Sequence, residues 1–135
     1  MRIAITNNPM VRGTLQGQEP AVKPGHIKRS GEGAPPVAEF HDTDCLGVFF
    51  AVRDRIHLGH SLLTHPLSGS VKPWETPYKT VIITGEKGVL DENSLSIIEE
   101  SIQACVKLQA SAVKKVWSAE MLADFQFIDF HLIFG

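Results

Sequence analysis

The stretch VAEFHDTDCLGVFFAVRDRIHLGHSLLT, residues 37–64, predicts a strand, a helix and a second strand in direct succession. Val37–His41 forms the first strand in this interpretation, and Leu62–Thr64 forms the second. A strand, a helix and a strand in this order favour a right-handed crossover between parallel strands. The stretch therefore indicates an α/β architecture.

The predicted helix of this unit has a polar start, a glycine at its end and one apolar face. Asp42 or Thr43 can accept hydrogen bonds from the free amides of its first turn. Gly59 suits the left-handed conformation that ends many helices. The apolar residues recur at spacings of three and four, which places them on one side of the helix: Cys45, Phe49, Val52 and Ile56.

Further elements are predicted on both sides of this unit. Arg2–Thr6 reads as a buried strand, and KTVIIT, residues 79–84, is the clearest strand of the chain. Asp91 caps a long helix that runs to about Lys114. At the end of the chain we expect a short helix from Ser118 and then a strand over 125–134, although the helix could instead continue through Asp129.

These elements predict one α/β domain over residues 1–135, with helices packed on a mainly parallel sheet of four to five strands. Gly13–Pro36 interrupts it, because nine of its 24 residues are Gly or Pro and none is aromatic. Such a stretch buries little apolar surface, so we expect a mobile loop that is either functional, for example as a lid, or disordered.

The composition excludes several classes of function. The formal net charge is −2, from 13 basic and 15 acidic residues, so no global field attracts nucleic acid or an anionic membrane. The N-terminal sequence lacks the apolar run of a signal peptide, and no segment reaches the ~18 apolar residues of a membrane helix. Cys45 and Cys105 are outside any C-x-x-C pair and are interpreted as buried thiols of a cytoplasmic protein. A redox pair would require the two to be adjacent in space.

Two polar loops follow predicted strands, and ligands of open parallel sheets collect at such strand ends. TNNP, residues 6–9, follows the predicted strand Arg2–Thr6, and HPLSGSVKP, residues 65–73, follows the predicted strand Leu62–Thr64. Backbone amides, hydroxyls and a lysine in the second loop could hold a small anion. The residues of this predicted anion site are His65, Ser68, Gly69, Ser70 and Lys72. The alternative is a structural loop that is merely polar.

Metal, cofactor and nucleophile motifs are weak. His57 and His60 are three residues apart, but Gly59 ends the helix between them, and His65 follows a strand. We therefore predict no metal site. There is no G-x-G-x-x-G, Walker or G-x-S-x-G sequence, so we predict no cofactor and leave the catalytic residues unassigned.

Residues 52–84, VRDRIHLGHSLLTHPLSGSVKPWETPYKTVIIT, resemble the signature stretch of the GrdX family. ITNNP at 5–9, LDENSLSIIEESI at 90–102 and DFQFID at 124–129 fit the same pattern. The family comprises small proteins associated with the glycine, sarcosine and betaine reductase systems of anaerobes that ferment amino acids. The Gly13–Pro36 segment is longer than the family usually carries.

The resemblance implies a cytoplasmic protein that works near glycine reductase, and it supplies no catalytic residues. Two functions are compatible with it. One is an accessory or regulatory protein that binds a component of glycine, sarcosine or betaine reductase, or a small anionic metabolite. The other is a small enzyme that acts on a carboxylate or phosphate compound of the same pathway. Neither uses nucleic acid or a membrane, and the oligomeric state is not determined by the sequence.

Overall fold

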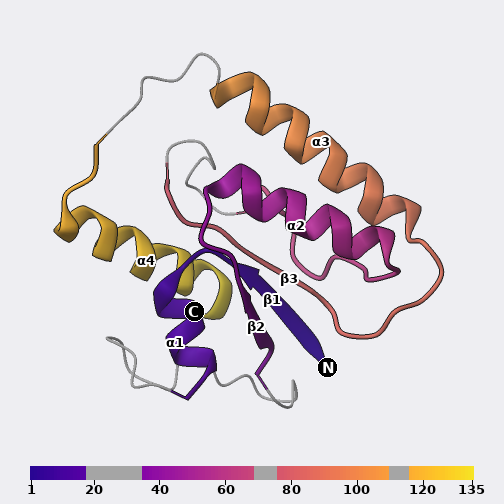
Figure 1. Ribbon diagram of the computed structural model, residues 1–135, viewed down its shortest axis with the longest axis horizontal. Coiled ribbons are helices and arrows are strands. Elements are labelled where there is room, and N and C mark those ends of the chain that lie inside the picture. Colours follow the sequence, from indigo (N-terminus) through magenta and orange to yellow (C-terminus); the bar gives the residue numbers. More distant parts are fainter. Residues whose placement is uncertain (18–34, 69–75, 110–115) are drawn as a thin grey trace.

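A mixed sheet of three strands lies at the centre of the protein, in the order β2-β1-β3 (Figure 1). The computed structural model describes residues 1–17, 35–68, 76–109 and 116–135. β1 (Arg2–Thr6) pairs in parallel with β2 (Val37–Phe40) and antiparallel with β3 (Thr80–Thr84). The antiparallel register sets Thr6 opposite Thr80, so the end of β1 meets the beginning of β3.

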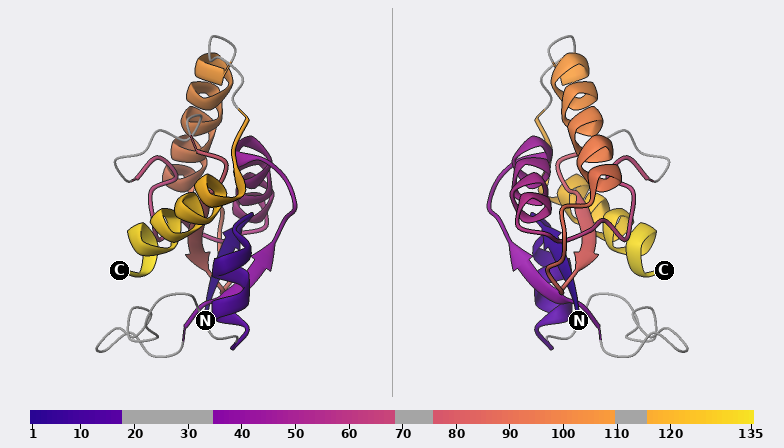
Figure 2. Two further views of the ribbon diagram at one scale, coloured as in Figure 1. Left: turned by 90° about the vertical axis from the view of Figure 1, so that its left-hand side faces the viewer. Right: turned by 90° about the vertical axis from the view of Figure 1, so that its right-hand side faces the viewer.

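Helices cover both faces of this sheet, as the side views show (Figure 2). α2 (Cys45–His57) packs on one face, and α3 (Glu92–Gln109) packs against α2. The strands contribute Ile3, Ile5, Val81 and Ile83 to that core. α1 (Pro9–Leu15) and α4 (Ala119–Phe134) lie on the other face, where the core consists of Ala4, Val11, Ile82, Phe130 and Phe134. Alternate strand residues thus supply two separate apolar cores.

The general α/β class is confirmed, but the prediction of a mainly parallel sheet of four to five strands is wrong. The parallel pair is formed by β1 and β2, with α1 between them in the chain. Leu62–Thr64 is not a regular strand, because it makes one isolated antiparallel bridge from Leu62 to Ile83. The Thr64 hydroxyl accepts the Ile82 amide hydrogen at 3.0 Å. A side-chain oxygen thus takes the place of the backbone carbonyl that a regular neighbouring strand would offer to Ile82.

The predicted C-terminal strand over 125–134 is also wrong, since α4 continues to Phe134. Ser118 caps this helix by accepting the Met121 amide hydrogen at 3.2 Å. Phe130 and Phe134, four residues apart, are buried side by side with ring centroids separated by 5.2 Å. The helical period was hidden because α4 also exposes apolar side chains, namely Met121, Phe127, Ile128 and Leu132.

The remaining predicted helices are confirmed with small changes. α2 buries the predicted face of Cys45, Phe49, Val52 and Ile56, but its cap is Asp44, whose Oδ1 accepts the Gly47 amide hydrogen at 2.9 Å. Asp91 accepts hydrogen bonds from the Asn93 amide and the Ser94 hydroxyl at the start of α3. The expected extension of that helix from 110 to 114 lies outside the described residues.

The predicted loop at Gly13–Pro36 begins later than expected. α1 continues through Leu15, and Asn8 caps this helix by accepting the Met10 amide hydrogen at 3.0 Å. Residues 18–34 lie outside the described part of the chain.

Cys45 and Cys105 are brought together between α2 and α3. Both are buried, at 2% and 0% exposed, and both belong to the same core. The hydrogen bond with Cys105, together with burial, raises the pKa of the Cys45 thiol, and the same hydrogen bond lowers the pKa of Cys105. The sequence left open whether these thiols are adjacent, and the packing of the two helices makes them neighbours.

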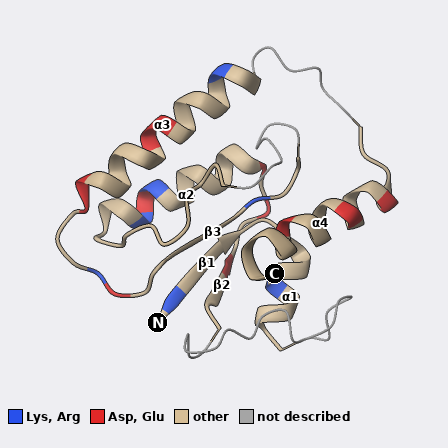
Figure 3. Ribbon diagram, turned by 180° about the vertical axis from the view of Figure 1, so that it is seen from behind, with Lys and Arg blue, Asp and Glu red and all other residues tan. Residues whose placement is uncertain are grey.

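Basic and acidic positions are interspersed along the described elements (Figure 3). Within the described ranges, none of the helices combines the length and apolar composition needed to cross a membrane.

Gly59 joins the end of α2 to the turn that follows β3. Its φ is +108°, and its carbonyl accepts the Gly88 amide hydrogen at 2.9 Å. A Cβ on Gly59 would lie 2.9 Å from the Gly88 nitrogen and would also collide with the Gly88 carbonyl oxygen. Both the backbone conformation and the close approach therefore require glycine at this position.

We predict that Gly59→Ala lowers the free energy of unfolding by about 2–4 kcal/mol, because it combines a strained positive φ with a backbone collision. The matched control is Gly17→Ala, since Gly17 has a φ of +88° but no atom of the described residues lies within 4 Å of its Cβ position. The control should lose about 1–2 kcal/mol from strain alone. Urea denaturation of both variants measures the difference, and equal losses would show that the approach to Gly88 is unimportant.

Candidate functional site

A chain of buried hydrogen bonds joins the end of β1, the beginning of β3 and α4. Asp129 Oδ2 accepts from the Thr80 hydroxyl at 2.7 Å and from Asn8 Nδ2 at 3.0 Å. The Thr6 and Thr80 hydroxyl oxygens are 2.7 Å apart, and the Asn8 amide donates to Thr6 Oγ1 at 3.0 Å. With Thr80 donating to Asp129, Thr6 must donate to Thr80. The backbone amide of Asn8 therefore donates to Thr6, Thr6 donates to Thr80, and Thr80 donates to the carboxylate. In such a chain, each hydrogen bond polarises and strengthens the next.

The two asparagines of the TNNP loop hold this region together. Asn7 Nδ2 donates to the carbonyls of Thr43 and Pro77 at 2.7 and 2.8 Å, and Asn7 Oδ1 accepts the Lys79 amide hydrogen at 2.8 Å. Asn8 caps α1 and also donates to the Gln126 carbonyl at 2.9 Å. Both amide groups are thus used to position neighbouring segments.

Lys79 is a buried cation beside this network. Its residue is 5% exposed, and its Nζ donates to the Ser68 carbonyl oxygen at 2.9 Å. Burial lowers the pKa of Lys79, although the charge of Asp129 opposes the shift. Burial likewise raises the pKa of Asp129 above its ordinary value, against hydrogen bonds from Asn8 and Thr80 and the charge of Lys79. Each group is therefore displaced toward its neutral form.

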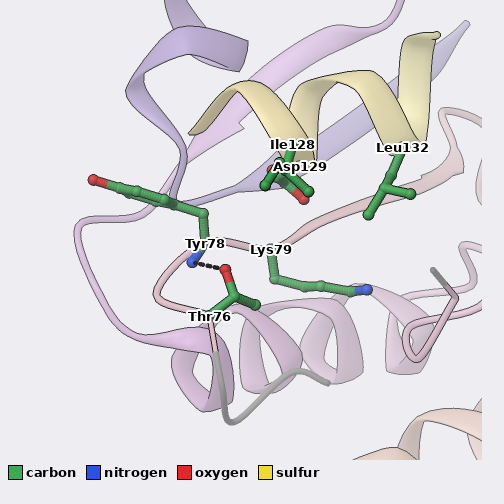
Figure 4. Close-up of a pocket in the computed structure, with 6 residues that line it drawn as sticks. All are labelled: Thr76, Tyr78, Lys79, Ile128, Asp129 and Leu132. Atoms are coloured by element: carbon green, nitrogen blue, oxygen red, sulfur yellow. Dashed lines mark hydrogen bonds between the residues drawn. The ribbon is translucent and has the colours of Figure 1, made fainter. Parts of the chain in front are cut away.

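Lys79 and Asp129 line one small pocket (Figure 4). Asp129 and Leu132 come from α4, and the Lys79 side chain runs below them from the start of β3. Ile128, Thr76 and Tyr78 complete the lining. The interior has a volume of about 10 Å³, which is close to the room that one water molecule needs, so only a small group can enter it.

The structure describes part of the anion site that the sequence predicts. His65 is exposed, and its Nδ1 accepts the Leu67 amide hydrogen at 3.0 Å, which leaves Nε2–H as the donor of the neutral ring. The Ser68 amide donates to the His65 carbonyl oxygen at 3.0 Å, and the Ser68 carbonyl oxygen accepts from Lys79. The other predicted residues, Gly69, Ser70 and Lys72, lie outside the described residues.

The histidines considered as metal ligands have separate surroundings. His57 is exposed at the end of α2, whereas His60 is 1% exposed and its Nδ1 lies 2.7 Å from the Thr84 carbonyl oxygen. Among the described residues, there is no group of three or more His, Cys, Asp or Glu residues that could hold a metal ion.

Sequence reasoning missed the pair of Lys79 and Asp129. The sequence predicts Lys79 as the first residue of a strand and Asp129 as part of a strand or of the end of a helix. The available signal was a charged residue at the start of one apolar run, Lys79, and a charged residue inside another, Asp129. Because the two residues are far apart in the sequence, their proximity is a property of the tertiary fold.

Two comparisons with known proteins found no match. A search of curated proteins and a search of solved structures each gave no significant similarity to this chain.

A comparison with protein families gave a match to the model described as a GrdX-like protein, over residues 3–135. The chain therefore belongs to the GrdX-like family, as its resemblance over residues 52–84 had suggested. Membership suggests an association with the glycine reductase system.

We predict that the stability of the protein relative to an Asp129→Asn variant falls as the pH rises above 3.8, the ordinary pKa of an aspartate. Because the folded-state pKa is raised, the native protein binds more protons than the unfolded chain between 3.8 and that pKa. Stability from this group is therefore present at low pH and is lost as the pH rises through this window, by at most about 1.4 kcal/mol per pH unit.

Urea denaturation of both proteins across this window measures the difference. The side-chain amide of the Asp129→Asn variant would keep an acceptor oxygen for Asn8 and Thr80, so the fold should be retained. Asp124→Asn is the control, because Asp124 is an exposed aspartate of the same helix. A pH-independent difference between wild type and Asp129→Asn would contradict the raised pKa.

Proposed function

We propose that this GrdX-like protein is a cytoplasmic accessory or regulatory protein of the glycine reductase system. In this proposal it binds a small anionic metabolite or a component of the reductase. Family membership supports the metabolic setting. The proposal treats residues 1–135 as one α/β domain and assigns the anion to the loop over 65–72.

The observation that carries the proposal is the hydrogen bond from Lys79 Nζ to the Ser68 carbonyl oxygen, at 2.9 Å. It brings a buried ammonium group to the beginning of the loop for which the sequence predicts an anion site. An ammonium group has three N–H donors, and this bond uses one of them. Lys79 therefore retains donors for a ligand oxygen.

The proposed ligand is a carboxylate or phosphate compound of small size. In the proposed site, Lys79 and Lys72 donate charge-assisted hydrogen bonds, and the hydroxyls of Ser68 and Ser70, the amide of Gly69 and the Nε2–H of His65 are further donors. Each charge-assisted hydrogen bond contributes roughly 1.5–3 kcal/mol. Two or three of them, less the cost of immobilising the ligand, correspond to a dissociation constant on the order of micromolar to millimolar.

We predict that Lys79→Met weakens binding of acetate and phosphate at least about tenfold, because it removes one charge-assisted hydrogen bond. Isothermal titration calorimetry at low ionic strength measures this effect. Lys87→Met is the matched control, since Lys87 is exposed and should leave the affinity unchanged. Lys72→Ala tests the loop itself and should also weaken binding about tenfold. Absence of anion binding to the wild type would refute the proposed site.

A buried amine and a buried carboxyl group in one pocket also favour the second candidate, a small enzyme acting on a carboxylate or phosphate compound. The pKa of Lys79 is lowered and that of Asp129 is raised, and groups displaced in this way are typical of residues that exchange protons with a substrate.

Turnover separates the two candidates. For an accessory protein we expect no product when the protein is incubated with acetyl phosphate or glycine and followed by NMR spectroscopy. Copurification of reductase components from a glycine-fermenting lysate, identified by mass spectrometry, would support the accessory function. Product formation that is abolished in Lys79→Met would instead establish the enzyme.

A further inference from the structure

Two ionisable residues of opposite charge type, Lys79 and Asp129, line the pocket between α4 and the start of β3. Lys79 is 5% exposed and Asp129 is 6% exposed, so both charged groups are largely removed from water. Each charge influences the pKa of the other, but the hydrogen bonds of both groups go to other residues: Lys79 Nζ donates to the Ser68 carbonyl, and Asp129 accepts from Asn8 and Thr80. A buried charge without close pairing is costly, and a ligand that supplies the missing partner is favoured.

The hydrogen bonds of the two groups show how each could meet a ligand. Lys79 Nζ donates to the Ser68 carbonyl oxygen and has further donors for a carboxylate. Asp129 Oδ2 accepts from Asn8 and Thr80, which fixes the position of the carboxylate, and a carboxylate offers about four acceptor sites in total. One end of the pocket is therefore suited to an anion, and the other is suited to a cation.

A ligand with a single charge would satisfy only one of these groups. A simple carboxylate or phosphate would pair with Lys79, but it would place a second negative charge near Asp129. A simple amine would pair with Asp129, but it would place a second positive charge near Lys79. A molecule that carries a carboxylate and an ammonium group a short distance apart is complementary to both.

The size and the lining of the pocket restrict the skeleton of such a molecule. The interior of about 10 Å³ excludes a large side chain. The total empty space is about 230 Å³ when the open mouth is included, so the remainder of a small ligand can lie at the mouth. Ile128 and Leu132 form an apolar wall there and are 39% and 46% exposed. A short hydrocarbon segment between the two charges fits this wall.

We propose that this pocket binds a small zwitterionic α-amino acid, with its carboxylate at Lys79 and its ammonium group at Asp129. The inference rests on the proposed function, because Lys79 is the cation of the proposed anion site, and it narrows the ligand class from small anions to zwitterions. The ammonium group of the ligand would itself favour the ionised form of Asp129.

Three probes of nearly equal size test the proposal by calorimetric titration of the full chain at low ionic strength. Glycine carries both charges, glycolate replaces the ammonium group by a hydroxyl, and glycinamide replaces the carboxylate by an amide. We expect glycine to bind at least about tenfold more tightly than either of the other two, since each lacks one charge-assisted interaction.

Asp129→Asn identifies the group that recognises the ammonium. In this variant we expect the preference for glycine over glycolate to fall to within about threefold, mainly through weaker binding of glycine. The control Asp124→Asn makes the same change on an exposed residue of α4 and should keep the wild-type preference. Circular dichroism establishes that each variant is folded. If Asp129→Asn is unfolded, the three-probe comparison on the wild type decides the question.

The outcomes distinguish this inference from the proposed function. Equal or tighter binding of glycolate and inorganic phosphate than of glycine would overturn the zwitterion and leave the anion-binding function in place. Tight glycine binding that is unchanged in Asp129→Asn would overturn the assignment of the ammonium group to this residue. Absence of binding by all probes would overturn both.

Discussion

The acceptance of two hydrogen bonds by Asp129 is the interaction on which the arrangement of α4 depends. Apolar contacts of Phe130 and Phe134 attract α4 to the sheet, but such contacts have little directional preference. The bonds from Asn8 and Thr80 attach one carboxylate to the beginning of α1 and to β3 at once. Loss of the carboxylate would leave these buried donors unsatisfied, at a cost of about 1–3 kcal/mol for each group. They thereby select one position of α4 among many apolar alternatives.

This attachment buries the carboxylate of Asp129, and the surrounding structure compensates only part of the cost of burying its charge. Lys79 supplies a nearby positive charge, and both groups are shifted toward neutrality by burial. Apolar residues at these positions would cost less free energy to bury. Perturbed charges that line a pocket are more typical of binding and catalytic sites than of a structural core. The same residues therefore serve the packing of α4 and form the best candidate for ligand recognition.

The direction of β3 is what assembles this site. Because β3 runs antiparallel to β1, the chain enters β3 where β1 ends, and Thr80 lies opposite Thr6. Lys79, one residue earlier, then lies beside Asn7 and the TNNP loop. A parallel β3 would have placed the same lysine at the other end of the sheet. The mixed sheet thus explains why polar residues far apart in the sequence meet at one point.

Local patterns in the sequence determined the elements whose polar and apolar residues are clearly separated. The buried face of α2, the strands β1 and β3, and the GrdX-like family could all be predicted, because periodicity and motifs depend on neighbouring residues. The helical state of Phe125–Phe134 could not, since α4 is apolar on several sides and its period is hidden. Strand direction, the contact of Cys45 with Cys105 and the meeting of Lys79 with Asp129 were decided only by the tertiary structure. Each of these depends on which distant surfaces pack together, and that choice reflects the burial and hydrogen bonding of the whole chain.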